Sequence, residues 1–331
     1  MDECVQSVAV SCGCVGSRWC AVCEDTPRAL EAAKIRAEVA DIGAAVDAQY
    51  GPDHRGGVSF AQLPSIPRQW LCLECCSLCT PLDPDVCVTR CSQHGKDVDP
   101  KGLPGLMIAK GFVSETEEAE LIHFLDNSHK SPAGFEGWKD SQGGRRKQPY
   151  GPAPNFKKRK VKVRPDDPGF PAAMKFLFDR VGSYLLDKPH LSLPVRPTKA
   201  PTEKDYVPVS GAPFRMAECS GLDYEPYTAS NLDPHIDDTW LWGDRVVGLS
   251  LIGTTVMTFV SAGKEVCVVL EPRMLFVLSG EVRYNWMHGI RGQHTTTRRV
   301  SITIREMARD FVSNDTDRVT DAILAFASTF V

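Results

Sequence analysis

A run of short, β-branched segments in the last third of the chain constrains the fold most strongly. Gly or Pro turns separate these segments, and each is the length of a strand rather than of a helix. Helical patterns come before the run, so helices are followed by closely spaced strands. This order predicts an α+β fold with a β-sandwich or barrel core. The expected strands span residues 246–252, 254–260, 265–270, 274–278 and 299–304.

Two helices are expected before these strands. Ser114 and Glu117 have the spacing of a capping box, which predicts the start of a helix. Its inward face would carry Leu121, Ile122 and Leu125. A second helix is expected over residues 172–187, where apolar residues recur at helical spacing: Met174, Leu177, Phe178, Val181 and Leu185. A further helix is expected at the C-terminal end, over residues 311–331.

Cysteines dominate the N-terminal part, where the first 91 residues contain 11 of the 13. Cys12, Cys14, Cys20 and Cys23 form a C-x-C-x5-C-x2-C cluster, and four thiolates can close a tetrahedral zinc site. A structural zinc ion is therefore a candidate, with unligated or redox-active thiols as the alternative. A second group offers more ligands than one zinc ion needs, and a thiol-rich loop is its alternative: Cys72, Cys75, Cys76, Cys79, Cys87 and Cys91.

These patterns divide the chain into five segments. After the first cluster, apolar residues at spacings of four and three predict an amphipathic helix that leads into a Gly- and Pro-rich linker. The segments are residues 1–26 (first cysteine cluster), 27–70 (amphipathic helix and linker), 71–102 (second cysteine-rich segment), 103–310 (main globular domain) and 311–331 (C-terminal helix).

Basic residues are concentrated between positions 139 and 164. Ten Lys or Arg and one acid give this stretch a charge of +9, although the whole chain carries −4. Aromatic residues interleave with the basic ones, so the stretch could stack a base and grip phosphate, or hold an acidic protein surface. A solvated basic loop is the alternative. The candidate substrate-binding residues are Arg145, Arg146, Lys147, Tyr150 and Phe156.

Part of the same stretch also predicts where in the cell the protein is found. Residues 157–160 fit a nuclear import signal. No apolar run approaches the roughly 20 residues that span a bilayer, and Asp2 and Glu3 stand where a secretory signal would be basic. We therefore expect a nuclear and cytoplasmic protein without a membrane partner.

His235 and Asp237 form an H-x-D motif. In an extended chain, residues i and i+2 point to the same side, so the imidazole and the carboxylate converge. His288 is the candidate third ligand. Two histidines and one carboxylate on one face are typical of non-haem Fe(II) oxygenases, which keep the other positions open for a co-substrate and O2. Ordinary core histidines are the alternative, because H-x-D alone is a weak motif.

Arg299 and Arg305 lie in the last expected strand, six residues apart and so on one face. Val300, Ile302 and Ile304 occupy the opposite face. Arginines on an inward polar face need an anion, and 2-oxoglutarate is a dicarboxylate that guanidinium groups can bind bidentately. A solvated strand edge is the alternative.

Together these residues resemble the AlkB-like dioxygenases. The resemblance covers residues 103–307 and comprises H-x-D, a distal His followed by Gly-Ile, and R-x5-R. It implies a double-stranded β-helix (jelly-roll) core and the use of Fe(II), 2-oxoglutarate and O2. The activity it implies is oxidative demethylation, in which a hydroxylated N-methyl group leaves as formaldehyde.

One subgroup of the family resembles the chain over three longer stretches, residues 12–24, 141–156 and 222–243. The resemblance implies a cofactor contact for Tyr224 and places the substrate lid at about residues 139–164. Two positions depart from the family pattern: Leu222 stands where an Asn contacts 2-oxoglutarate, and Ser301 replaces an Asn between the two arginines.

The resulting functional hypothesis is oxidative N-demethylation. The subgroup is linked to a methylated lysine in actin, so a methylated protein is the favoured substrate. N6-methyladenine in DNA is the first alternative. The second, from a different class, is a zinc-stapled interaction module whose dioxygenase fold is catalytically idle.

Overall fold

The fold is described from a computed structural model. The described residues are 68–71, 73, 78–79, 97–98, 102–156, 158–163, 168–186, 188, 213–261, 264–313 and 318–331. Several predictions lie outside them: the candidate zinc ligands Cys12, Cys14, Cys20 and Cys23, the helix expected after residue 27, and the side chains of the second cysteine group.

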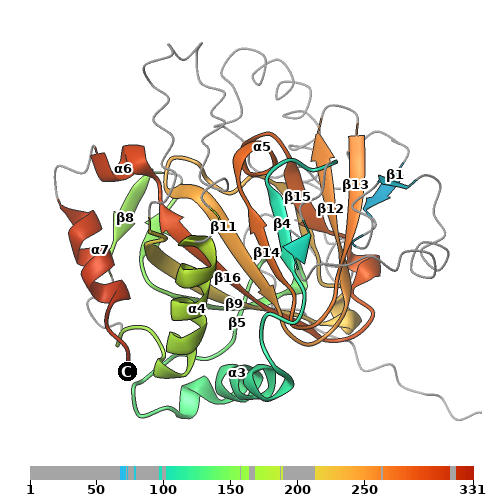
Figure 1. Ribbon diagram of the computed structural model, residues 1–331. Helices are drawn as coiled ribbons and strands as arrows, with labels where there is room; N and C mark the ends of the chain where they lie inside the picture. Colours follow the sequence, from blue (N-terminus) through green and yellow to red (C-terminus); the bar gives the residue numbers. More distant parts are fainter. Residues whose placement is uncertain are drawn as a thin grey trace, which may run out of the picture.

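Two β-sheets form the body of the described part (Figure 1). Hydrogen-bonded neighbours within the larger sheet are antiparallel. In spatial order the larger sheet contains β3 (Asp97–Val98), β4 (Leu106–Ala109), β14 (Leu275–Leu278), β11 (Trp242–Ser250), β16 (Arg299–Met307), β9 (Met216–Tyr224), β6 (Arg146–Tyr150) and β5 (Lys139–Asp140).

The smaller sheet is also antiparallel, except that β1 runs parallel to β13. Its strands are β10 (Leu232–His235), β15 (Met287–Ile290), β12 (Thr255–Ser261), β13 (Lys264–Leu270), β1 (Arg68–Leu71) and β2 (Leu78–Cys79). A separate hairpin pairs β7 (Ala153–Asn155) with β8 (Lys160–Lys162). Two facing antiparallel sheets joined by strands that alternate between them form the expected double-stranded β-helix.

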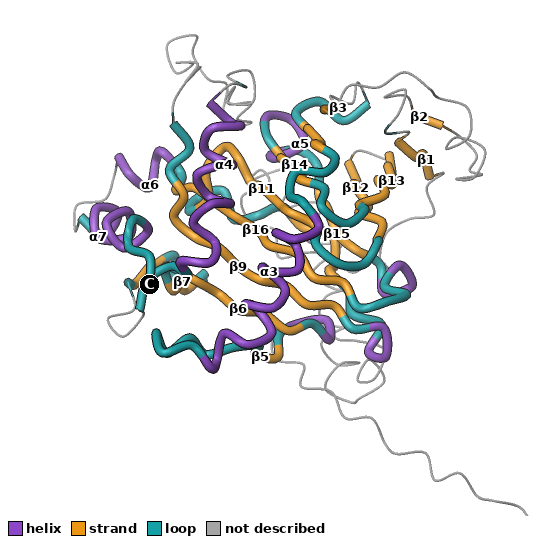
Figure 2. Tube along the Cα trace, turned by 60° about the horizontal axis from the view of Figure 1, so that its bottom comes forward, coloured by secondary structure: helices purple, strands orange, loops and turns teal. Residues whose placement is uncertain are grey.

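Apolar side chains fill two layers. One layer lies between the sheets, where Val246 and Phe276 of the larger sheet pack with Phe259 and Val268 of the smaller. The other lies between the larger sheet and the helices that cross it. Figures 1 and 2 show α3 (Glu115–Asn127) and α4 (Lys175–Leu186) lying across this outer face.

The two helices predicted before the strands and the five predicted strands are confirmed. Their first and last residues differ from the predicted ones. Ser114 caps α3 through the predicted capping box, and Leu121 and Leu125 are fully buried. The helix expected over residues 172–187 begins with the 3-10 turn η5 (Ala172–Met174) and continues as α4. Each of the five expected strands has a counterpart; β11 begins four residues earlier than expected and β16 ends three residues later.

The C-terminal helix expected over residues 311–331 is shorter in the structure than its predicted range. The structure instead has α6 (Arg309–Ser313) and α7 (Val319–Ala327). Between them the sequence reads Asn-Asp-Thr-Asp, residue types that favour turns and helix ends over helix interiors. Arg318 has the left-handed φ of 56°, so the backbone turns just before α7.

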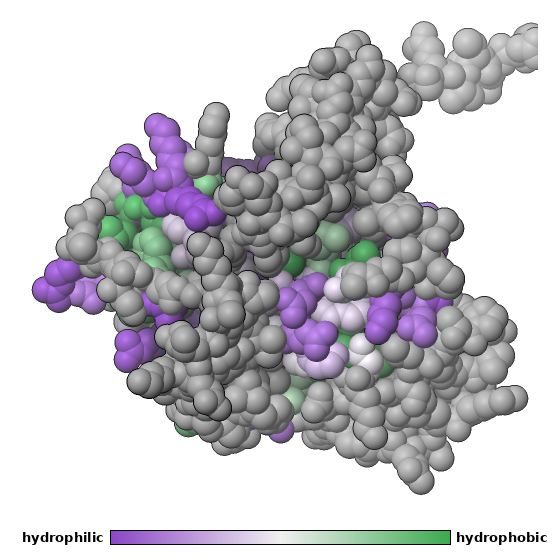
Figure 3. Space-filling view, turned by 90° about the horizontal axis from the view of Figure 1, so that it is seen from above, coloured by the Kyte–Doolittle hydropathy of each residue, from purple (hydrophilic) through white to green (hydrophobic). Residues whose placement is uncertain are grey.

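The remaining described elements are short. They are α5 (Gly280–Tyr284) and the 3-10 turns η3 (Ser128–Lys130), η4 (Gln142–Gly144), η8 (Pro226–Thr228) and η9 (Gly292–His294). Within the described residues, no helix has the length and apolar character needed to cross a membrane. Seen from above, the described surface alternates between hydrophilic and hydrophobic areas (Figure 3).

Candidate active site

The two predicted histidine ligands face each other across a strand pair. β10 runs antiparallel to β15, with His235 opposite His288 and ring centroids 4.5 Å apart. Gly289 permits this closeness: a Cβ atom there would lie 2.5 Å from the carbonyl oxygen of Leu232 on β10. Asp237 follows two residues after His235. Ligand atoms of the three residues all lie within 4.8 Å of one another. Such a set fits a divalent metal ion with open coordination positions.

Hydrogen bonds orient these candidate ligands. Nδ1 of His235 lies 3.0 Å from the carbonyl oxygen of Asp233, which leaves Nε2 for a metal ion. Oδ2 of Asp237 lies 3.7 Å from Nε2 of His288. Arg305 donates from Nε and Nη2 to the other oxygen of Asp237, at 3.1 and 2.8 Å. This converging set does not fit the alternative of unrelated core histidines.

Electrostatics keep Asp237 ionised. Burial of the carboxyl group opposes its charge, but the positive charges of Arg305, His235 and His288 outweigh this and hold the pKa of Asp237 far below its usual range. An ionised carboxylate is the form that binds a metal ion.

Arg299 lies on the inner face of β16 and is 2% exposed. It donates from Nη1 to Oγ of Ser301 at 3.0 Å and from Nη2 to Oγ of Ser250 at 3.2 Å. Its guanidinium stacks over the ring of Tyr224, 4.9 Å from the centroid. Burial, with the nearby positive charge of Arg145, lowers the pKa of Arg299.

This buried cation lacks an anionic partner. Among the described residues no carboxylate lies within ion-pair distance of Arg299, and its Nε–H has no hydrogen-bond partner. A buried guanidinium without a counter-charge is costly, so the site is suited to a ligand carboxylate. The strand-edge alternative does not fit a side chain this buried.

Arg305 is on the same inner face, as predicted, but carboxylates of the protein already occupy it. Besides Asp237, it donates from Nη1 to Oε2 of Glu218 on β9, at 2.7 Å. Its guanidinium also lies 5.7 Å from the ring centroid of Trp242. Arg305 thus holds the candidate metal-binding carboxylate, and its predicted contact with 2-oxoglutarate stays a prediction.

Tyr224 and the two departures from the family pattern lie together with Arg299. The Tyr224 ring is 1% exposed and packs with Leu222, Leu232 and Ile290. The hydroxyl of Ser301 accepts from Arg299, although it is shorter than an Asn side chain. At Leu222 an apolar contact replaces the polar one.

Two of the predicted lid residues, Arg145 and Arg146, are bound by groups of the protein itself. Arg145 is 7% exposed and lies over the Tyr224 ring, at 5.6 Å. Arg146 pairs with Asp223 and Glu225. Arg146 begins β6, an inner strand of the larger sheet, and Arg145 lies just before it, where its Nε donates to the carbonyl oxygen of Gln142. They are therefore not placed to grip phosphate.

Tyr150 is also misassigned as a stacking residue. It is 4% exposed, packs edge-on against Phe135 and donates its hydroxyl to Gln148 at 2.7 Å. It is a core residue beneath α3. Lys147, by contrast, points towards the inner face, with Nζ 3.8 Å from Oε1 of Glu218.

Phe156, another predicted lid residue, is exposed to solvent. It is 49% exposed, in the connection between β7 and β8. The exposed Lys158, Arg159, Lys160 and Lys162 surround it on this hairpin. Val161 of β8 packs against a cluster that includes Leu241 and Trp242, just after the H-x-D motif. Arg159 is close enough to Asp238 to lower the pKa of that carboxyl, although burial and Asp237 raise it overall.

Arg283 is a contributor that the sequence did not indicate. It is 2% exposed and donates to the main-chain carbonyls of Asp237, Trp242 and Gly243, at 2.9–3.0 Å. It thereby fixes the turn that follows the motif. The residue belongs to α5, and only the fold brings it to this turn.

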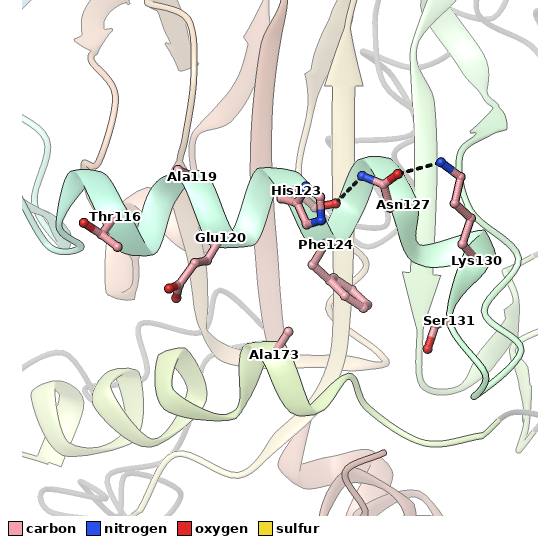
Figure 4. A pocket seen from close by; sticks show the side chains of 9 residues that line it. All are labelled: Thr116, Ala119, Glu120, His123, Phe124, Asn127, Lys130, Ser131 and Ala173. Carbon is pink, nitrogen blue, oxygen red and sulfur yellow. Dashed lines mark hydrogen bonds between the residues drawn. The ribbon is translucent and has the colours of Figure 1, made fainter.

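A groove elsewhere contains none of these residues (Figure 4). It lies along α3 on the helical side of the larger sheet and has a volume of about 710 Å³. Its lining residues are Thr116, Ala119, Glu120, His123, Phe124, Asn127, Lys130, Ser131 and Ala173.

Known proteins resemble the chain over most of its length. No family model matches it. A Caenorhabditis elegans protein named DNA N6-methyl adenine demethylase is 30% identical over 308 residues, which cover 92% of this chain and 89% of that protein. The human and mouse proteins named alpha-ketoglutarate-dependent dioxygenase alkB homolog 4 are 32% and 31% identical, each over 63% of this chain and over 69% and 70% of their own lengths.

A solved structure of OsALKBH1 aligns with 61% of this chain and 97% of its own, at 18% identity and a TM-score of 0.43. The sequence relatives are named as dioxygenases or as a demethylase, and two of them belong to the subgroup that the three stretches resemble. The chain belongs to the AlkB-like 2-oxoglutarate-dependent dioxygenases, a family of oxidoreductases that use Fe(II), 2-oxoglutarate and O2.

Proposed function

We propose that His235, Asp237 and His288 hold Fe(II), and that Arg299 binds the distal carboxylate of 2-oxoglutarate. When bound, these cofactors couple the decarboxylation of 2-oxoglutarate to hydroxylation of an N-methyl group. One atom of O2 enters succinate and the other enters the methyl carbon. The hydroxymethyl group then leaves as formaldehyde, and the nitrogen regains a proton.

Arg299 is the observation that carries this proposal. Its guanidinium is fully buried beside Tyr224, yet it contacts hydroxyl groups rather than carboxylates. Within a water-poor site, an arginine binds a carboxylate through charge-assisted hydrogen bonds, and Nε is available to make one. Arg305 has a separate task, because it holds Asp237 with Glu218 as its second anchor.

We further propose that the methyl group is carried by N6-methyladenine in DNA. The relative named for that activity matches this chain over 92% of its length. An exposed hairpin with Phe156 among basic residues lies beside the segment after the metal motif, where an unpaired nucleotide could stack. Methylated lysine in a protein such as actin is the competing substrate.

Product analysis tests both parts. Purified protein with Fe(II), ascorbate and 2-oxoglutarate should release succinate and formaldehyde from a single-stranded N6-methyladenine oligonucleotide and leave adenine. Methylated actin serves as the competitor. Faster formaldehyde release from actin would overturn the DNA assignment. Undiminished succinate formation by Asp237→Ala would overturn the iron site.

Two further expectations belong to this proposal. The candidate zinc site at Cys12, Cys14, Cys20 and Cys23 predicts one tightly held zinc ion, which metal analysis of the purified protein would detect. A fluorescent fusion is expected in nucleus and cytoplasm, and neutralising residues 157–160 should reduce the nuclear share.

A further inference from the structure

Lys147 lies on the inner face of β6, beside the candidate iron site. The next residue, Gln148, hydrogen-bonds to α3 on the opposite side of the sheet, so the strand alternation turns Lys147 inward. Its Nζ lies 3.8 Å from Glu218, and Glu218 accepts a hydrogen bond from Arg305. Since Arg305 also binds Asp237, a chain of charged groups leads from Lys147 to the predicted iron ligand.

Lys147 is the member of this chain that meets solvent. Its side chain is 37% exposed, compared with 4% for Glu218 and 15% for Arg305. The ammonium is therefore the part of this charged chain that a ligand in solvent can contact most readily. Burial of its stem, with the charges of Arg305 and Arg145, lowers the pKa of Lys147, whereas Glu218 acts in the opposite direction.

Positive charge is in excess around the site. Fe(II) and the dianion of 2-oxoglutarate cancel each other, so cofactor binding does not remove the excess. Arg299 and Arg145 have no carboxylate within ion-pair distance among the described residues. The cationic side chains are Arg145, Lys147, Arg283, Arg299 and Arg305, and the carboxylates are Glu218, Asp237 and Asp238.

We propose that Lys147 selects the substrate by charge: it admits an N-methyl group on an uncharged base and opposes one on a cation. This inference rests on the proposed function, because it names the residue that reads the charge of the methylated group. N6-methyladenine is neutral, whereas 1-methyladenine and methylated lysine are cations at neutral pH. One charge about 10 Å away, at an effective dielectric constant of about 20, changes binding by on the order of tenfold.

Two oligonucleotides of identical sequence provide the test, one with N6-methyladenine and the other with 1-methyladenine. Their phosphates are the same, so only the charge of the base differs. Wild-type protein should have the higher kcat/KM for the neutral base. Lys147→Gln should raise the relative kcat/KM for the cationic base about tenfold, and Lys147→Glu more. Lys147→Arg should keep the wild-type ratio. Lys175→Gln, an equal charge change on the exposed start of α4, should keep it too.

Anaerobic binding of both oligonucleotides to the Mn(II)- and 2-oxoglutarate-loaded protein, read by fluorescence anisotropy, makes the same comparison without turnover. If no formaldehyde forms but the binding ratio shifts in Lys147→Gln, demethylation is overturned and charge selection stands. If Lys147→Gln and Lys147→Glu both leave the ratio within twofold of wild type, while melting as wild type does, charge selection is overturned. Charge selection would also be overturned by two results together: methylated actin is turned over faster than the neutral oligonucleotide, and this turnover falls in Lys147→Gln.

Discussion

Replacing Arg299 by Met should separate cofactor binding from stability. Arg299 is buried without a carboxylate partner, so in the absence of 2-oxoglutarate its charge is uncompensated. Met has a similar length and no charge. The substitution therefore removes an unfavourable buried cation and two hydrogen bonds to serine hydroxyls at once. We expect the melting temperature of the cofactor-free protein to stay level or rise.

The affinity for 2-oxoglutarate, by contrast, should fall in Arg299→Met. Loss of a buried guanidinium–carboxylate pair costs about 2–4 kcal/mol, which weakens 2-oxoglutarate binding about 30- to 1000-fold. Ligand binding stabilises the folded state in proportion to the logarithm of the ligand concentration over Kd. The rise in melting temperature that 2-oxoglutarate and Mn(II) give the wild type should therefore be nearly absent in Arg299→Met.

The adjacent Arg298 is the matched control. It binds Asp126 and the fully buried Asp223, with nitrogen–oxygen distances from 2.6 to 3.2 Å. Arg298→Met should therefore destabilise the protein by about 1–3 kcal/mol and leave 2-oxoglutarate affinity unchanged. Differential scanning fluorimetry with a cofactor titration reads both effects. Two results would refute this role of Arg299: a large loss of stability in cofactor-free Arg299→Met, or an affinity of Arg299→Met for 2-oxoglutarate equal to that of wild type.

Three further results are expected. Arg305→Met frees one oxygen of Asp237 and should weaken Fe(II) or Mn(II) binding about 10- to 100-fold in a direct metal titration; unchanged metal affinity would contradict this. The ion pair with Arg180 is the main cause that lowers the pKa of Glu117 to about 2. The stabilisation by this ion pair is thus present above about pH 4.5 and lost as pH falls towards 2. Wild type should be more stable than Glu117→Gln by less than about 1 kcal/mol at neutral pH, and melts in acid should show this difference disappear over that range. Phe156→Ala should weaken single-stranded oligonucleotide binding by about 1–3 kcal/mol in anisotropy titrations, without a change in melting temperature.

The period of the strands explains which placements of candidate site residues could be predicted from the sequence. His235 and Asp237 are two residues apart and Arg299 and Arg305 six, so alternation alone places each pair on one face. The apolar residues between the arginines, Val300, Ile302 and Ile304, were expected on the opposite face; they lie in the core layer between the larger sheet and the helices. This placement follows from the spacing within one strand and does not depend on which strands pair with it.

The failures concern contacts made across strands. The basic stretch was expected to form a substrate lid because of the family resemblance and its excess of positive charge, yet Arg146 is neutralised by Asp223, which lies 77 residues away. Glu218, the second anchor of Arg305, is 87 residues from it. Tyr150 shares β6 with Lys147, but faces the opposite side of the sheet. Composition and spacing do not show which residues of different strands lie side by side. Only the paired sheet shows this.

Anaerobic absorption spectroscopy tests the central claim most directly, because the chelate of Fe(II) with 2-oxoglutarate absorbs weakly in the visible range. Wild-type protein loaded with iron should develop this absorption when 2-oxoglutarate is added. His288→Ala should not develop it, and Arg299→Met should need about 30- to 1000-fold more 2-oxoglutarate. Absence of the absorption from iron-loaded wild type, or its undiminished presence in His288→Ala, would contradict the assignment of the site.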